Sequence, residues 1–284
     1  MADELVYFRG SPWSLKCVWA AHLLGFGTIY QEKLIFSEYN FPMGQLGLRF
    51  RLGDWSSPIT IPILFPKASS EQPLRSSYDI LHFLNNKAEE YKTSNFNVAE
   101  TGNTEHVSSL SLKDEQVIQW DMRLDTVMRF LRGLMMKYDD ITPYLVPIPV
   151  HYIPGALSLI SSIQKKYFIS KYGEVDTQIS KEEVENILRE ANERLSQSSF
   201  LVGEKLTYAD ISLATALESM APEDPERPIT VMAPALNTHS LFKEMFDRRF
   251  PRLLPWKKQI LTDHFSPNVE KQVLVPLTMK IARL

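Results

Sequence analysis

The beginning of the chain has the pattern of a strand, a helix and a second strand, and this pattern limits the possible folds most. Residues 5–8 form an apolar run that indicates a strand. Residues 14–24 carry apolar side chains at helical spacing and end at Gly25, and residues 29–36 form another strand-like run. Because such an order packs as a right-handed βαβ unit, we expect two parallel strands with a helix between them. The chain therefore starts with an α/β domain.

A third apolar run and a second helix complete this domain. Residues 58–65, PITIPILF, are rich in β-branched side chains but contain Pro62, which a strand accommodates only at an edge or a bend. Such a proline is a candidate for a cis peptide bond. Residues 76–84 then show the apolar spacing of a helix, with Ser77 near its start. We expect the first domain to cover residues 1–86.

The composition changes after this domain. Residues 87–113 are polar and show no sustained period, as is typical of a linker or a surface excursion. Apolar residues then recur at helical spacing, which predicts an all-helical C-terminal domain over residues 114–284, including a tail, residues 266–284, whose position the sequence does not indicate. The helices are expected at residues 114–138, 154–171, 181–197, 207–220 and 252–262.

Composition excludes several classes of protein. The 284 residues carry a formal net charge of -3, without the basic surface that nucleic-acid binding requires. No apolar stretch is long enough to span a membrane, and the N-terminal residues lack the basic start of a signal peptide, so we expect a cytoplasmic protein with no membrane partner. A single cysteine, Cys17, excludes an intramolecular disulfide, and scattered histidines indicate no metal site. We expect Cys17 to pack as a small apolar side chain.

Residues 200–214, FLVGEKLTYADISLA, contain a signal for the start of a helix. Thr207 precedes Asp210 by three residues at the head of an apolar segment, which is the Asp form of a capping box. This signal predicts local structure and carries no chemistry by itself.

The turn between the first strand and the first helix, within YFRGSPWSLKCVW (residues 7–19), has residue types that suit an anion. Hydroxyl groups and free backbone N–H groups at a helix N-terminus stabilise negative charge. Ser11 stands where the helix begins and Ser14 follows one turn later. From the turn alone, Ser11 is either a helix N-cap or an anion-binding group.

Four segments in order, SPWS, TIPI, SSYDI and FLVGEKLTYADISLA, together closely resemble the glutathione transferase superfamily. The turn is most similar to the serine- and cysteine-type classes, such as the Zeta and Omega classes and bacterial-type members. The resemblance implies a thioredoxin-like, glutathione-binding N-terminal domain and an all-α C-terminal domain. It also implies a cytoplasmic, homodimeric detoxification enzyme that activates glutathione as a thiolate for attack on a small apolar electrophile. A non-catalytic binding or interaction module of the same fold is the alternative.

The resemblance assigns catalytic roles in the turn. Ser11 matches the position of the catalytic Ser or Cys, where its O–H would donate to the glutathione sulfur, and Ser14 is the second catalytic candidate. Trp13 lies between them and is expected to contact glutathione. Because position 11 is not a cysteine, the thiol-transferase branch of the superfamily is disfavoured.

The resemblance also assigns the remaining glutathione-binding positions. Ile61 and Pro62 match the cis-proline and its preceding residue, whose backbone pairs with the cysteinyl part of glutathione. Ser77 matches the serine that receives the γ-glutamyl carboxylate at a helix N-terminus. Ser76 departs from the pattern, because this position is usually a Glu or Asp that pairs with the γ-glutamyl ammonium.

The helix expected at 114–138 is rich in Met and aromatic residues, which either wall an apolar pocket for the second substrate or belong to the core. These residues are Trp120, Met122, Met128, Phe130, Met135 and Met136.

Overall fold

The computed structural model of the protein describes most of the chain. The described residues are 3–8, 10–26, 33–34, 42–67, 72–94, 110–137, 159, 162–163, 166, 169–173, 175–225, 227, 229–230, 242, 245–267 and 269–270. The expected helix at 154–171 and the tail at 266–284 lie largely outside these residues.

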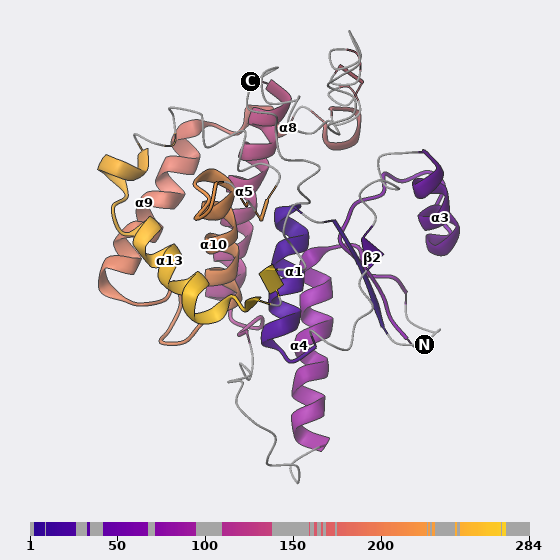
Figure 1. The fold of residues 1–284 in the computed structure, drawn as a ribbon, viewed down its shortest axis with the longest axis horizontal. Coiled ribbons are helices and arrows are strands. Elements are labelled where there is room, and N and C mark those ends of the chain that lie inside the picture. The colour runs from indigo at the N-terminus through magenta and orange to yellow at the C-terminus, as the bar shows by residue number, and fades with distance from the viewer. Residues whose placement is uncertain are drawn as a thin grey trace.

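The described elements form an α/β part followed by a helical part (Figure 1). The first part contains β1 (Glu4–Tyr7), α1 (Pro12–Leu23), β2 (Lys33–Leu34), α3 (Pro42–Leu52), β3 (Ile63–Phe65) and α4 (Ser77–Ser94). The second part contains α5 (Glu115–Lys137), α8 (Val175–Gln178), α9 (Lys181–Gln197), α10 (Tyr208–Met220), the π-helical turn η2 (Met245–Arg249) and α13 (Leu253–His264). None of the described helices is long and apolar enough to cross a lipid bilayer.

The strands form one sheet in the order β2-β1-β3. β1 pairs with β2 in parallel, as the βαβ pattern predicts, and with β3 in antiparallel orientation. Alternate residues of β1 face opposite sides of the sheet. Leu5 and Tyr7 join the main core with α1 and α4, whereas Val6 packs with Leu48 of α3 and with Ile63. The sheet is therefore covered on both faces, and Figure 1 shows α3 on the side away from α1 and α4.

Helix α1 is the central element of the molecule. It packs against α4 on one side and α10 on the other, so it joins the two parts of the chain (Figure 1). Pro12 and residues 14–21 are all buried, including the ionisable side chain of Lys16. The sequence suggested one apolar face, but a helix that is covered on all sides is apolar almost all round.

The predicted helices of the second part agree closely with the structure. α9 has the expected bounds, α5 and α10 begin one residue later than expected, and α13 begins one residue later and ends two residues later. In the first part, the end of one predicted helix was wrong and one helix was missed. α4 continues to Ser94 instead of ending at residue 84, because its polar second half projects beyond the core, as Figure 1 shows. α3 was not predicted, because its segment contains Gly44 and Gly47 and leaves the apolar side chains of Leu46 and Phe50 exposed.

The predicted capping box at the start of α10 is confirmed. The Asp210 carboxylate accepts hydrogen bonds from the backbone N–H and the hydroxyl of Thr207 and from the backbone N–H of Leu201. All of these groups are buried, and burial raises the pKa of Asp210 to about 6 although the hydrogen bonds oppose this shift. The carboxylate therefore holds the preceding loop against the first turn of α10.

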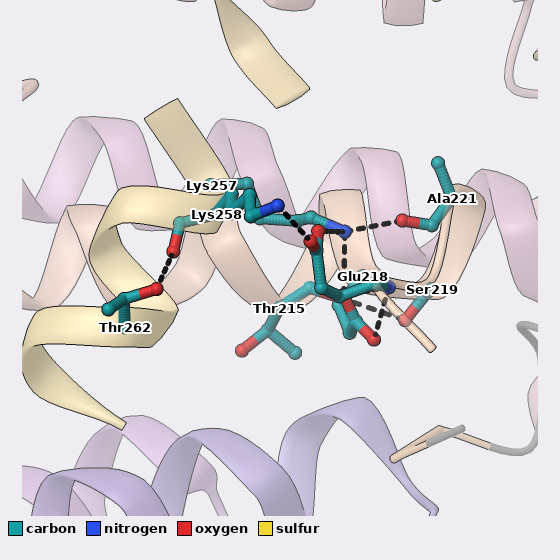
Figure 2. A network of polar contacts seen from close by, with 8 residues as sticks. Thr215, Glu218, Ser219, Ala221, Lys257, Lys258 and Thr262 are labelled. Carbon is teal, nitrogen blue, oxygen red and sulfur yellow. Dashed lines mark hydrogen bonds and ion pairs between the residues drawn. The ribbon is translucent and has the colours of Figure 1, made fainter. Parts of the chain in front are cut away.

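A buried ion pair connects α10 to α13 (Figure 2). The Nζ of Lys257 lies 2.7 Å from a carboxylate oxygen of Glu218, and the two side chains are 1% and 4% exposed. Lys257 also donates to the backbone oxygen of Ala221, while the Glu218 carboxylate accepts from the backbone N–H of Glu223. Because neither charge is left without a partner, this network fixes the C-terminal helix against the helical core.

Candidate functional site

Ser11 is the N-cap of α1, at the junction with β1. Its backbone is extended, with φ -76° and ψ 125°, and its Oγ accepts a hydrogen bond from the backbone N–H of Ser14 at 3.4 Å. Pro12 follows in the first helical position, where its missing N–H is tolerated. The Ser11 side chain is half-buried, and its hydroxyl proton is not used in the capping bond. This position can therefore donate to an anion in front of the helix N-terminus.

Ser14 lies beneath the same turn. It is 1% exposed, and its Oγ accepts a hydrogen bond from the backbone N–H of Phe8 at 3.1 Å. This bond ties the first turn of α1 to the end of β1. The structure thus brings both predicted catalytic serines to one turn, with Ser11 nearer to solvent.

The peptide bond between Ile61 and Pro62 is cis, as predicted. Pro62 is buried and Ile61 is half-buried at the entry to β3. Within the described part of the chain, no hydrogen bond involves the backbone of Ile61. Its N–H and C=O groups are thus available to an extended ligand.

Ser76 and Ser77 form the start of α4. Ser76 is exposed and its Oγ accepts from the backbone N–H of Asp79 at 3.4 Å, so it caps the helix, while Ser77 is its first residue and is half-buried. Ser76 and Asp79 have the same spacing as Thr207 and Asp210, a signal that the sequence analysis did not use at this position.

A carboxylate network lies next to Ser76. Arg75 pairs with Asp54 at 2.5 Å, and Asp54 also accepts hydrogen bonds from the backbone N–H groups of Ser57 and Ser56. These bonds, the one from Ser57 first, hold the pKa of Asp54 well below its usual range. Both Arg75 and Asp54 are thus occupied with each other.

Cys17 connects α1 to α4. It is fully buried, as predicted, and its thiol donates to the backbone oxygen of Ser77 at 3.8 Å. Burial raises the pKa of Cys17 to about 12; the positive charge of Lys16 opposes this shift and Asp121 adds to it. Cys17 is a packed side chain between two helices that both contribute to the site.

Trp13 reaches from the turn to the helical part. Its indole Nε1 donates to Asp125 of α5 at 2.7 Å, and its ring lies 4.7 Å from the guanidinium of Arg132. The side chain is half-buried. Trp13 therefore contacts α5 directly.

Arg132 belongs to a cationic cluster that the sequence analysis missed. Its Nε donates to Asp176 of α8 at 2.6 Å, and Arg129 donates to the other oxygen of the same carboxylate at 2.9 Å. The Arg132 guanidinium also lies 3.8 Å from the ring of Tyr172. Lys171 is close by, and burial, followed by the charge of Arg132, lowers the pKa of Lys171 to about 8. Because Asp176 lies 47 and 44 residues from Arg129 and Arg132, no local motif indicates this cluster.

A second buried network lies deeper between α1, α5 and α10. Lys16 pairs with Asp121 at 2.8 Å, and Ser212 donates to the same carboxylate oxygen at 2.6 Å. The Lys16 ammonium also lies 5.1 Å from the ring of Tyr208. This network holds α1, and with it the Ser11 turn, against the helical part.

The helical part also supplies backbone at the Ser11 turn. Gly10 forms an isolated parallel bridge with Thr230. Gly10 has a φ of +88°, which favours glycine, and Thr230 is fully buried with a hydroxyl that has no hydrogen-bond partner in the described residues. One edge of the turn is therefore covered by a residue of the helical part that is 220 positions away in the sequence.

The Met and aromatic residues of α5 are mostly core. Five of the six are buried, whereas Met122 is 67% exposed: the buried ones are Trp120, Met128, Phe130, Met135 and Met136. Among the described residues, no three His, Cys, Asp or Glu side chains are grouped so that they could hold a metal.

Part of the chain matches a known protein family. Residues 140–262 match the family model of the glutathione S-transferase C-terminal domain. A search of curated proteins found no match.

Several solved structures have the same fold. One is a glutathione S-transferase from Methylobacillus flagellatus with glutathione bound, at TM-score 0.54 and 15% identity, with 96% of this chain and 100% of that chain covered. Another is the Xi glutathione S-transferase from Phanerochaete chrysosporium, at TM-score 0.54 and 15% identity, with 96% and 81% covered. A third is Ure2p in complex with glutathione, at TM-score 0.53 and 15% identity, with 95% and 97% covered.

At this identity the structural matches establish the fold, and they confirm the expected small α/β N-terminal part with a helical C-terminal part. The family match assigns the helical part independently. Together, these two findings show that the chain has the glutathione transferase fold and that residues 140–262 match the glutathione S-transferase C-terminal domain.

Proposed function

We propose that this protein is a serine-type glutathione transferase in which Ser11 stabilises the glutathione thiolate. The observation that carries the proposal is the position of Ser11 at the N-cap of a 12-residue helix, half-buried, with its hydroxyl proton free to donate. A hydroxyl donor and the positive end of the helix dipole both favour the thiolate over the thiol. Ser14 has a supporting role in this proposal, because its oxygen already holds the backbone of Phe8.

Glutathione would bind as an extended peptide along the α/β part. The backbone groups of Ile61, which form no hydrogen bond within the described residues, would pair with its cysteinyl unit. The start of α4 at Ser77 would receive the γ-glutamyl carboxylate. We assign this binding domain to residues 1–86, the linker to 87–113, into which α4 continues as far as Ser94, and the helical domain, which supplies the electrophile site, to 114–284.

The proposed reaction is a conjugation. The thiolate sulfur forms a bond to an electrophilic carbon of a small, largely apolar substrate, the leaving group departs with its electron pair, and the thiol proton passes to solvent. Ionisation of the thiol and the close approach of the two substrates supply the rate gain. We place this cytoplasmic detoxification chemistry in a homodimer, as the superfamily resemblance implies.

The test is the Ser11→Ala variant, assayed with glutathione and 1-chloro-2,4-dinitrobenzene. We expect kcat/KM to fall by about 10- to 1000-fold, equivalent to about 1.4–4 kcal/mol, and the pH at which activity reaches half its maximum to rise. The matched control is Ser180→Ala, which removes the hydroxyl that accepts from the Glu183 N–H at the N-cap of α9, far from the turn in sequence.

Both variants lose an N-cap, which costs about 0.5–2 kcal/mol of stability. Only the Ser11 variant should lose activity. Equal kcat/KM and equal pH profiles in the wild type and the Ser11→Ala variant would refute the catalytic role of Ser11.

A non-catalytic module of the same fold is the second candidate, and Ser76 favours it. This position lacks the carboxylate that the superfamily uses for the γ-glutamyl ammonium, and its neighbour Arg75 already engages Asp54. The test uses a panel of aryl halides, epoxides and enones at saturating glutathione. If the wild-type protein conjugates none of them, the protein is a non-catalytic module.

A further inference from the structure

We infer that Arg132, with Arg129 and Lys171, forms a subsite that binds a carboxylate on the electrophilic substrate. The inference rests on the proposed transferase function and specifies its second substrate as an apolar electrophile with an anionic group.

Arg132 is held in a fixed orientation. Its Nε donates to Asp176 at 2.6 Å, and aromatic rings of Trp13 and Tyr172 lie 4.7 Å and 3.8 Å from its guanidinium carbon. Its side chain is 15% exposed. In the described residues, its two terminal nitrogens donate to no protein group, so a planar pair of donors remains for a ligand. A guanidinium fixed in this way matches the two oxygens of a carboxylate.

The charges around Arg132 favour an anion. Asp176 is 1% exposed and is shared between Arg132 and Arg129, so one carboxylate faces two guanidinium groups. Lys171 adds a third cation, and Asp125, which accepts from Trp13, adds a second acid. Among the described residues, three cations and two carboxylates meet in a partly buried place, where the carboxylate of a ligand is stabilised more than in water.

The absence of a side chain at Gly133 allows Asp176 to lie next to the two arginines. A Cβ atom at Gly133 would lie 2.8 Å from the carbonyl carbon of Asp176, which is closer than a real Cβ tolerates. Glycine at 133, next to Arg132, thus permits the close packing of α5 against α8. The anchor of the two arginines depends on this contact.

We assign the cluster to the second substrate because its arginines belong to the helical part of the chain. Trp13, which lies under Arg132, is two residues beyond Ser11 in the first turn of α1. The arginines belong to α5 of the helical part, whereas the proposed glutathione positions at Ile61 and Ser77 belong to the α/β part. An aromatic substrate whose carboxylate binds Arg132 would thus hold its ring on the Trp13 side of the glutathione sulfur.

The test compares two electrophiles that differ in one charge, 4-chloro-3,5-dinitrobenzoate and its methyl ester, at saturating glutathione. In both, the sulfur–carbon bond forms, the carbon–chlorine bond breaks, chloride leaves with the bonding pair and the thiol proton goes to solvent. We expect the Arg132→Met variant to lose about tenfold or more in kcat/KM for the acid and less than about threefold for the ester. Arg132→Lys should retain part of the preference.

Two further variants serve as controls for misfolding. Arg129→Gln leaves Arg132 and Asp176 paired and should reduce the preference for the acid less than Arg132→Met does. Arg123→Met is the matched control, because Arg123 also lies on α5, stacks on Trp120 at 4.6 Å and pairs with Glu190, away from the cluster. We expect it to leave the ratio of acid to ester unchanged.

Each outcome decides between the assignments. If Arg132→Met lowers the rates for acid and ester equally, or changes neither, the subsite is refuted while the transferase activity stands. If the variant raises the KM for glutathione with the ester, the cluster binds a carboxylate of glutathione and the electrophile assignment is overturned. If the wild type conjugates neither compound, the proposed function fails and the subsite fails with it.

Discussion

The Nζ of Lys16 lies 2.8 Å from Oδ1 of Asp121, and this buried ion pair joins α1 of the α/β part to α5 of the helical part. Ser212 of α10 donates to the same oxygen at 2.6 Å. One carboxylate therefore links three helices at the place where the two parts of the chain meet. Since α1 begins at Ser11, the pair also fixes the position of the proposed active-site turn.

The Lys16–Asp121 pair should contribute more to specificity than to stability. Asp121→Ala leaves the Lys16 ammonium buried without its partner, so we expect the free energy of unfolding to fall by about 3–5 kcal/mol in urea denaturation. The double variant Lys16→Met with Asp121→Leu removes both charges and should recover most of this loss. If the double variant is as unstable as the single one, the ion pair itself stabilises the junction and our explanation is wrong.

A carboxylate at position 76 should tighten glutathione binding. Ser76→Asp keeps an N-cap for α4 and supplies the missing partner of the γ-glutamyl ammonium, while Arg75 stays paired with Asp54. We expect the Kd measured by calorimetry to fall by about ten- to a hundredfold. Ser180→Asp at the N-cap of α9 is the control and should leave the Kd unchanged. An unchanged Kd for Ser76→Asp would indicate that another acid already holds the ammonium.

Cys17 should be unreactive in the native protein. Because burial raises the pKa of its thiol to about 12, only about one molecule in ten thousand carries the thiolate at pH 8. We expect no reaction with 5,5′-dithiobis(2-nitrobenzoate) within minutes in native buffer and one thiol per chain after denaturation. Fast native labelling at pH 8 would show that α1 separates from α4 far more often than its burial implies.

The preference for an anionic electrophile should depend on pH. Burial and the charge of Arg132 lower the pKa of Lys171 to about 8, so Lys171 is a cation below pH 8 and becomes neutral above it. Among the described residues, Arg132 is the charged group that acts on Lys171. The ratio of kcat/KM for the benzoate to that for its ester should therefore fall by about fivefold, or about 1 kcal/mol, between pH 7 and pH 9.5.

The ratio of two electrophiles cancels the ionisation of glutathione, which affects both substrates alike. Lys171→Arg, which stays charged, should show no such fall. A ratio that declines equally in the wild type and in Lys171→Arg would assign the titration to another group.

Local signals in the sequence predicted the local structure well. The turn at Ser11, the cis bond at Pro62 and the capping box at Thr207 each depend on residues that are close together in the chain, and the structure contains all three features. The Lys16–Asp121 pair and the cluster around Asp176 were missed, because their members are brought together only by the packing of helices. A buried lysine in an apolar helix is a signal that a distant acid is needed, but it does not indicate which one.

The bridge between Gly10 and Thr230 has a consequence for how the protein is made. The Ser11 turn leaves the ribosome early, whereas the segment that covers its edge follows after most of the helical part has been synthesised. During translation this edge of the turn stays without its Thr230 partner until about 220 further residues have been synthesised. The bridge therefore forms only after Thr230 has been synthesised, and shorter nascent chains lack part of the surface on which the proposed chemistry takes place.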